Sequence, residues 1–140
     1  MEVSKISYGD ENGALHTTQV RVRIYDVDAT GTVFFTCHQK WFDGIALVEF
    51  LKERNFDWMS IVVASITFEY KTPIFLDDLL DITIEDVEIG NKSFTVKSTI
   101  YIHDSGKVAA TGSAVYVYID EESRKAVPIP QDAREKLSSR

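Results

Sequence analysis

The chain is poor in cysteine, because Cys37 is the only one among its 140 residues. One cysteine cannot form an internal disulfide, and this favours a reducing compartment, so we expect a cytoplasmic protein. The segment Met1–Lys5 holds no basic stretch followed by an apolar run, so we expect no signal peptide. No apolar run is long enough to span a bilayer, which predicts that the chain has no membrane span.

Basic residues are scarce as well. The sequence has 15 Lys and Arg against 22 Asp and Glu, and its formal net charge is -7. Contacts to nucleic-acid phosphates need clustered cations, so this charge argues against a nucleic-acid partner. The three histidines His16, His38 and His103 are scattered without the spacing of metal ligands, so we predict no metal site.

The composition is otherwise that of a soluble globular protein, with 44% hydrophobic and 26% charged residues. We therefore expect a single domain over residues 1–140. Residues 1–16 are predicted to form a hairpin extension, with a strand before the turn at Asn12-Gly13. Residues 127–140 are predicted to form a tail with a short helix from Gln131 to Leu137.

Between these ends, the hydrophobic pattern changes from strand to helix and back to strand. Alternation over residues 20–25 predicts a strand with one buried face. Residues 38–54 predict a helix that is apolar around most of its circumference and must be enclosed by protein. Four more strands are predicted at Met59–Lys71, Leu79–Ile89, Ser93–His103 and Val108–Ile119. Turn residues at 90–91 and 104–106 predict that these strands are antiparallel.

One apolar helix and one antiparallel sheet must bury each other, so we predict an α+β fold in which the sheet wraps around one long central helix. A wrapped sheet keeps free edges, and edges tend to be paired or covered. We therefore predict a homo-oligomer that forms through an edge strand.

One stretch carries the chemistry. Residues 25–35, Tyr-Asp-Val-Asp-Ala-Thr-Gly-Thr-Val-Phe-Phe, run almost directly into Trp41-Phe42-Asp43. An acidic pair thus follows a strand pattern, and a glycine turns the chain into an apolar helix. This order predicts a carboxylate against an apolar wall, which suits the polar end of an oily acyl group.

These residues resemble the hotdog-fold acyl-CoA thioesterases of the 4-hydroxybenzoyl-CoA thioesterase type. Weaker similarities in the family's order are Asp77–Ile82, Asn91–Phe94 and Val127–Pro130, so the resemblance covers about residues 17–137. It implies a hotdog fold, a dimer or a dimer of dimers, and hydrolysis of acyl-CoA or another acyl thioester. It implies no cofactor, because coenzyme A is part of the substrate.

The resemblance also implies roles for particular residues. Asp28 would be the catalytic carboxylate, acting as a nucleophile or as a general base, and the two routes stay open. Its place before a buried helix predicts partial desolvation and a raised pKa. Amides at the helix start, within 36–41, would stabilise the oxyanion. Residues bordering the reacting group or the acyl chain would be Ser60, Ile61, Val33, Phe34 and Phe35.

Lys92 and Ser93, at a predicted turn, would meet the phosphates of coenzyme A. The chain departs from the family at two places. Many relatives have Asn-Tyr where this chain has Cys37-His38, and one subgroup has a histidine where it has Phe35. An assisting role for those side chains, and the choice of acyl group, therefore cannot be carried over.

Three alternatives accompany this interpretation. Asp26-x-Asp28-x-Thr30-Gly31 imitates the start of an EF-hand calcium loop, but the twelfth position is Cys37 instead of a bidentate Glu. A module that binds acyl-CoA without hydrolysing it would keep the same fold. A hotdog dehydratase would need a histidine as its acid and base, and only His38 lies near the motif. Adjacent helical residues point about 100° apart, so Cys37 and His38 do not predict a catalytic pair.

Overall fold

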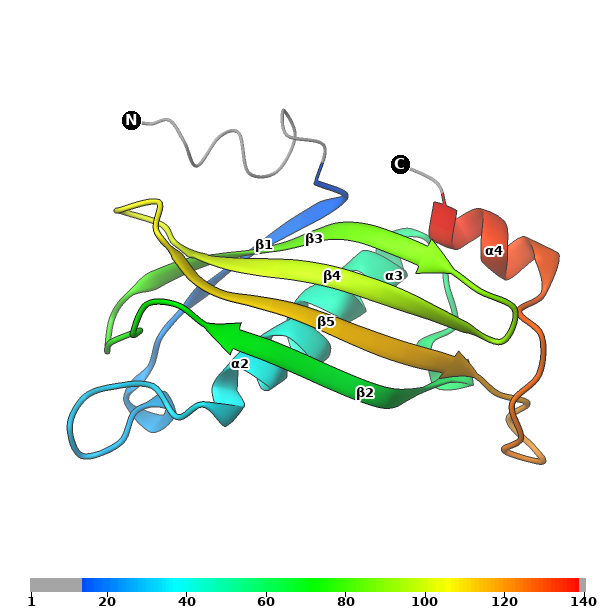
Figure 1. Ribbon diagram of the computed structural model, residues 1–140, viewed down its shortest axis with the longest axis horizontal. Coiled ribbons are helices and arrows are strands. Elements are labelled where there is room, and N and C mark those ends of the chain that lie inside the picture. The colour runs from blue at the N-terminus through cyan, green and yellow to red at the C-terminus, as the bar shows by residue number, and fades with distance from the viewer. Residues whose placement is uncertain (1–13, 139–140) are drawn as a thin grey trace.

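A five-stranded antiparallel sheet packs against one helical segment in the computed structural model, which describes residues 14–138 (Figure 1). The strand order across the sheet is β1-β3-β4-β5-β2, so β1 and β2 form its edges. The strands are β1 (His16–Arg21), β2 (Ile61–Tyr70), β3 (Leu79–Ile89), β4 (Ser93–Ile102) and β5 (Val108–Tyr118). The predicted hairpin around Asn12-Gly13 lies outside the described residues.

The four later strands lie where the alternating pattern predicts them. The bounds of β3 agree with the prediction, and those of β2, β4 and β5 are shorter by a residue or two at their ends. All the pairings are antiparallel, as the turn residues predicted. The turn between β3 and β4 is closed by a bond from the Gly90 amide to the carbonyl of Ser93.

The first strand was predicted over residues 20–25, but both of its bounds are wrong, because β1 covers His16–Arg21. β1 stops at Arg21, and Ile24–Asp26 form a turn of 3-10 helix, η2, although the alternation continues to Tyr25. The physical reason is a local hydrogen bond, in which a carboxylate oxygen of Asp26 accepts the amide of Arg23. Ile24 and Tyr25 are consequently exposed, because the sheet no longer covers them.

The predicted central helix consists of three consecutive segments. α2 (Thr36–Trp41) passes into a π-helical turn at Phe42–Ala46 and then into α3 (Leu47–Glu53). The helix is therefore long only when these segments are taken together. Of the five residues expected to form its polar edge, Gln39, Glu49, Lys52 and Glu53 are exposed, whereas Asp43 is only partly exposed.

The core lies between this helix and the inner face of the sheet. Most large side chains with no more than 1% of their surface exposed come from the helix and from β3 and β4: Trp41, Phe42, Phe50, Leu51, Leu80, Ile82, Ile84, Phe94, Val96 and Ile100. Fully burying one large apolar side chain stabilises a fold by about 1.5–3 kcal/mol. The two apolar patterns thus bury each other, as the sequence predicted.

Gly112 on β5 leaves room for the ring of Phe68 on β2. A Cβ atom at position 112 would lie 2.5 Å from Cε1 of Phe68 and 2.9 Å from its Cδ1. The ring has little freedom to withdraw, because the rings of Phe42, His38 and Tyr70 pack around it. The glycine is therefore required for close packing between these strands.

We expect Gly112→Ala to lower the free energy of unfolding by about 1–3 kcal/mol, measured by urea denaturation. Gly44→Ala is the matched control, because a Cβ there meets nothing within 4 Å and the residue is helical. That control should raise stability by about 0.5–1 kcal/mol. Equal effects of the two substitutions would contradict this account, and adding Phe68→Leu to Gly112→Ala should restore part of the loss.

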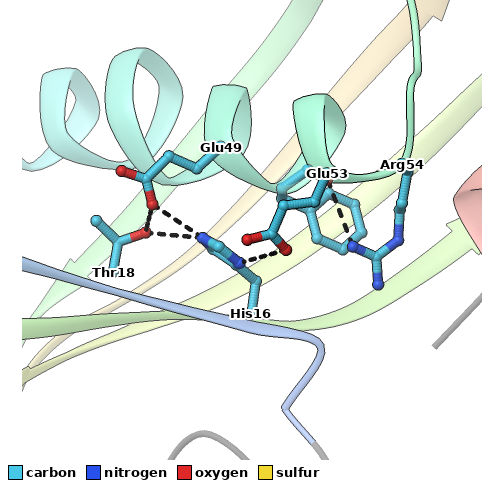
Figure 2. A network of polar contacts seen from close by, with 6 residues as sticks. His16, Thr18, Glu49, Glu53 and Arg54 are labelled. Atoms are coloured by element: carbon cyan, nitrogen blue, oxygen red, sulfur yellow. Dashed lines mark hydrogen bonds and ion pairs between the residues drawn. The ribbon is translucent and has the colours of Figure 1, made fainter.

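The edge strand β1 is joined to α3 by polar contacts (Figure 2). The imidazole of His16 lies between two carboxylates, with Nε2 3.0 Å from Glu49 and Nδ1 3.2 Å from Glu53. The hydroxyl of Thr18 donates to the same Glu49 oxygen at 2.7 Å. Burial raises the pKa of Glu49, but the bonds from Thr18 and His16 outweigh it and hold that pKa below its ordinary value. These contacts fix the helix against β1.

The tail forms α4 (Gln131–Ser138), which covers one end of the sheet. Two of its own side chains, Ala133 and Leu137, are buried. The guanidinium of Arg134 donates to the carbonyls of Gly90 and Asn91 at 2.6 and 3.2 Å. α4 therefore holds the turn between β3 and β4 in place.

Candidate active site

Asp28 lies in a tight loop between η2 and α2. The Asp28 amide donates to the carbonyl of Thr32 at 2.9 Å, and Val27 and Val33 form an isolated antiparallel bridge. Gly31 has φ +85°, in the left-handed region that glycine adopts without strain. The sequence thus builds a short turn that begins at Asp28 and closes at Thr32.

The carboxylate of Asp28 is held by the residues that follow it. The amide and the hydroxyl of Thr30 donate to Oδ1 at 2.8 and 2.6 Å, and the hydroxyl of Thr32 is 3.3 Å from each carboxylate oxygen. The hydrogen bonds from Thr30, followed by those from Thr32, hold the pKa of Asp28 below its ordinary value. The side chain is exposed, so the expected desolvation and raised pKa are wrong for the single chain.

Thr30→Ala tests this account of the carboxylate. We expect the pKa of Asp28 to rise towards its ordinary value of 3.8, because the largest of these effects is the bond from the Thr30 hydroxyl. Thr32→Val should raise it less. Carboxyl carbon chemical shifts followed across an NMR pH titration measure both changes, and an unaltered titration of Asp28 in Thr30→Ala would contradict the account.

A pocket of about 400 Å³ opens beside this loop, between the start of α2 and the end of β2. Its walls are mainly apolar and comprise Thr32, Val33, Phe35, His38, Tyr70, Lys71, Thr72, Pro73 and Ile74. Thr32 both lines the pocket and donates to Asp28, so the carboxylate lies at its border. Of the three consecutive apolar residues 33–35 predicted for the site, Val33 and Phe35 line this pocket, whereas Phe34 does not and is half exposed.

The start of the helix borders the same pocket. Phe35 occupies the cap position of α2, and no side chain caps the helix there. The carbonyl of Phe35 accepts hydrogen bonds from Nδ1 of His38 and from the hydroxyl of Tyr70, both at 3.2 Å. The first amides of a helix lack an acceptor in a preceding helical turn. The amide of Cys37 donates instead to the carbonyl of Phe34 at 3.0 Å, so the amide of Thr36 is the candidate donor at this position.

His38 is buried among aromatic rings at the start of α2. Trp41, Phe68 and Tyr70 surround its imidazole. Burial lowers the pKa of His38, and the ring is therefore neutral near pH 7. Cys37 is buried as well, and burial raises the pKa of its thiol.

Ser60 and Ile61 lie at the end of β2 that is farthest from this pocket. Ile61 begins β2, whereas Tyr70, beside the pocket, ends it. Ten residues of strand span about 30 Å, so one chain cannot bring Ser60 and Ile61 to its own Asp28. Ser60 is buried, and its hydroxyl donates to the carbonyl of Asp57 at 2.6 Å.

Lys92 and Ser93 are neighbours of Ser60 and Ile61 at that opposite end. The amide of Tyr118 donates to the carbonyl of Lys92, and Tyr118 pairs with Ile61 in the ladder between β2 and β5. Figure 1 shows the turn between β3 and β4 at the right-hand end of the sheet, while the loop before α2 lies at the left. The predicted site residues therefore form two groups within one chain.

A second pocket, of about 190 Å³, contains a polar pair that the sequence analysis did not identify. It lies between α3 and the start of β2, and its wall includes Asp43, Leu51, Trp58 and Tyr116. The hydroxyl of Tyr116 donates to Asp43 at 2.6 Å, and burial followed by this bond raises the pKa of Tyr116 well above its ordinary value. An acidic residue beside Trp41-Phe42 was the available signal, but nothing in the sequence identified its partner.

The calcium-loop alternative does not fit the geometry. Asp26 is buried, and its carboxylate is occupied by Lys40 at 2.8 Å and by the amide of Arg23. Within residues 14–138 no group of three or more His, Cys, Asp or Glu could hold a metal ion. No helix in that range is both long and apolar enough to cross a membrane.

A family model and a curated relative both match this chain to thioesterases. Residues 22–137 match the model of the thioesterase-like superfamily. The long-chain acyl-CoA thioesterase FadM of Escherichia coli is 30% identical over 134 residues, which cover 86% of this chain and 95% of FadM.

Solved structures agree with this match. A Thermus thermophilus thioesterase, crystallised with coenzyme A and Zn, has a TM-score of 0.81 and 25% identity over 89% of this chain and 92% of its own. The fold is also that of a 1,4-dihydroxy-2-naphthoyl-CoA thioesterase from Synechocystis, with a TM-score of 0.79 and 18% identity over 87% and 94% of the two chains. The expected hotdog fold is confirmed, and the chain belongs to the thioesterase-like superfamily of thioester hydrolases.

Proposed function

We propose that this protein hydrolyses acyl-CoA, or an acyl group carried on another thiol, with the carboxylate of Asp28 as nucleophile or general base. The observation that carries the proposal is the position of an ionised Asp28 at the border of an apolar pocket and beside an uncapped helix start. Such a pocket suits an acyl chain, and the amide of Thr36 at the helix start suits the developing oxyanion. The family match and FadM support the thioester as substrate class.

Two routes use Asp28. In the first, a carboxylate oxygen attacks the carbonyl carbon, the carbon–sulfur bond breaks, and the thiolate leaves; water then hydrolyses the resulting anhydride. In the second, Asp28 takes a proton from water as the water attacks, and the same bond breaks. Thr30 and Thr32 keep the carboxylate ionised in either case, because their bonds favour its charged form.

A homodimer through β2 would join the two groups of site residues. β2 is an edge strand, and exposed apolar side chains lie along it and just before it: Trp58, Met59, Val62, Val63 and Tyr70. Antiparallel pairing of two β2 strands about Ser65 would place Ile61 of one copy near Tyr70 of the partner subunit. The sheet edge would be covered, and Ser60 and Ile61 would approach Asp28 across the interface.

Lys92 and Ser93 would then lie on the same side of the interface as Ser60, where the phosphates of coenzyme A would meet an exposed ammonium. We propose no metal or redox cofactor for this chemistry. The single buried cysteine suits a reducing compartment, so we propose that the enzyme works in the cytoplasm.

The proposal is tested by incubating the protein with aliphatic and aromatic acyl-CoAs of different lengths and measuring free thiol. We expect thiol release from at least one class, and Cys37 adds little background because it is buried. Binding of every acyl-CoA without thiol release would instead favour the non-hydrolytic module. Turnover of a hydroxyacyl thioester to an enoyl thioester, abolished by His38→Ala, would favour the dehydratase.

A further inference from the structure

Asp26, two residues before Asp28, carries a carboxylate that the proposed chemistry does not use. Only 2% of its surface is exposed. One oxygen accepts the amide of Arg23 at 2.9 Å and the other accepts Nζ of Lys40 at 2.8 Å. A buried charge with this many partners is costly to leave unpaired, so its contacts determine the local backbone.

The backbone of Asp26 forms the base of the loop that presents Asp28. Its carbonyl accepts a hydrogen bond from the amide of Phe34 at 3.0 Å. The next residues toward the loop, Val27 and Val33, pair with each other. The loop therefore returns to Asp26 immediately before α2 begins. A displacement of Asp26 would move both ends of the loop.

Lys40 connects this base to the helix. It belongs to α2, whose start borders the pocket, and its ammonium lies 5.9 Å from the ring centroid of Tyr25. The hydrogen bond to Asp26 raises the pKa of Lys40, which keeps the ammonium charged. The pair thus joins the base of the loop to α2 through a charged contact, beside the weaker bond from the Cys37 thiol to the Asp26 carbonyl at 3.6 Å.

We propose that Asp26 and Lys40 are positioning residues, which hold the Asp28 loop in register with the start of α2. The inference rests on the proposed function, because it assigns to the pair the alignment of the reacting carboxylate with the pocket and the helix amides. Asp26 is too deeply buried to touch a substrate itself. A misplacement of about 1 Å in a reacting group can cost about 100-fold in rate.

The test compares Asp26→Asn and Lys40→Met with Lys40→Arg in the thiol-release assay. We expect Asp26→Asn and Lys40→Met to lower kcat by about 10- to 100-fold with little change in KM. Lys40→Arg keeps the cation and should restore kcat to within a few-fold of the wild type. Asp26→Asn is nearly isosteric, so it remains informative should Lys40→Met fail to fold.

Asp81→Asn is the matched control. Asp81 is as buried as Asp26, and its partners Gln19 and His103 lie on the other face of the sheet from the helix. It should lower stability while leaving kcat unchanged. A kcat loss in Asp26→Asn no greater than that in Asp81→Asn, or no rescue by Lys40→Arg, would overturn the inference.

A second measurement does not depend on turnover. If the pair holds the loop, Asp26→Asn should raise the pKa of Asp28 in an NMR titration, because Thr30 and Thr32 would no longer be aligned with it. Asp81→Asn should not raise it. Full activity of Asp28→Asn would refute the proposed function, whereas an inactive Asp28→Asn beside a fully active Asp26→Asn would refute only this inference.

Discussion

Asp28→Asn is expected to lower the rate of thiol release by about 100- to 10,000-fold, the range over which a positioned base contributes to catalysis. Asparagine has nearly the same shape and keeps an oxygen that can accept from Thr30. It lacks the charge needed to attack a carbonyl or to take a proton from water. The fold should be unaffected, because the side chain is exposed and makes no contact with the core.

Asp120→Asn controls for the loss of an exposed acid. Asp120 also lies in a turn, and hydrogen bonds from Ser123 likewise hold its pKa below the ordinary value. We expect its thiol release to equal that of the wild type. Equal rates for Asp28→Asn and the wild type would remove the basis of the proposed mechanism.

The pH dependence of the wild type follows from the same carboxylate. The reactive form is ionised, so activity is lost only as the pH falls through the pKa of Asp28, which lies below 3.8. We therefore expect kcat/KM to stay constant from pH 7 down to about pH 5, where an ordinary carboxyl is still mostly ionised. An acid limb centred near pH 6 would contradict this assignment.

Ser65→Lys is expected to give a monomer with at least about 100-fold lower thiol release, because a misplaced reacting group alone can cost this much. Ser65 is exposed near the middle of the edge strand β2. In an antiparallel pair about this position, the two introduced ammonium groups would lie close together and repel each other. Sedimentation should show a mass near 15.9 kDa for the variant and about twice that, or a multiple of it, for the wild type.

High salt and a lysine at a control position test whether repulsion between the introduced ammonium groups is what separates the dimer. The Debye length falls to about 3 Å at 1 M salt, so high salt should restore part of the dimer and of the activity. Thr111→Lys is the control, since Thr111 lies in the interior strand β5 opposite Glu69. It should keep at least a dimer and full activity. A monomeric wild type with full activity would exclude a site shared between two chains.

Much of the fold could be predicted because its signals are local. The bounds of β3 agree with the alternating pattern, and Gly90-Asn91 predicted the turn that follows. The end of β1 could not be predicted in this way. Val22 and Ile24 continue the alternation, but a hydrogen bond that the amide of Arg23 donates to the Asp26 carboxylate replaces the strand by a 3-10 turn.

The candidate site was predictable in part. The motif identified Asp28, and the structure places it beside a pocket, but its exposure and lowered pKa depend on the hydroxyl groups of Thr30 and Thr32. Asp43 and Tyr116 are 73 residues apart in the chain, and no local pattern relates them. The same is true of Tyr70 and Phe35, which meet only where the end of β2 reaches the helix start.

By itself, the sequence determined which segments are strands and helix, that the helix and sheet bury each other, and which loop carries the carboxylate. These features follow from periodicity, turn residues and a short motif, all of which act over a few neighbouring residues. Only the tertiary structure decided that Asp26 is buried against Lys40 and that the predicted site residues form two groups about 30 Å apart. Those outcomes depend on contacts between distant segments, whose geometry is set by the packing of the whole domain.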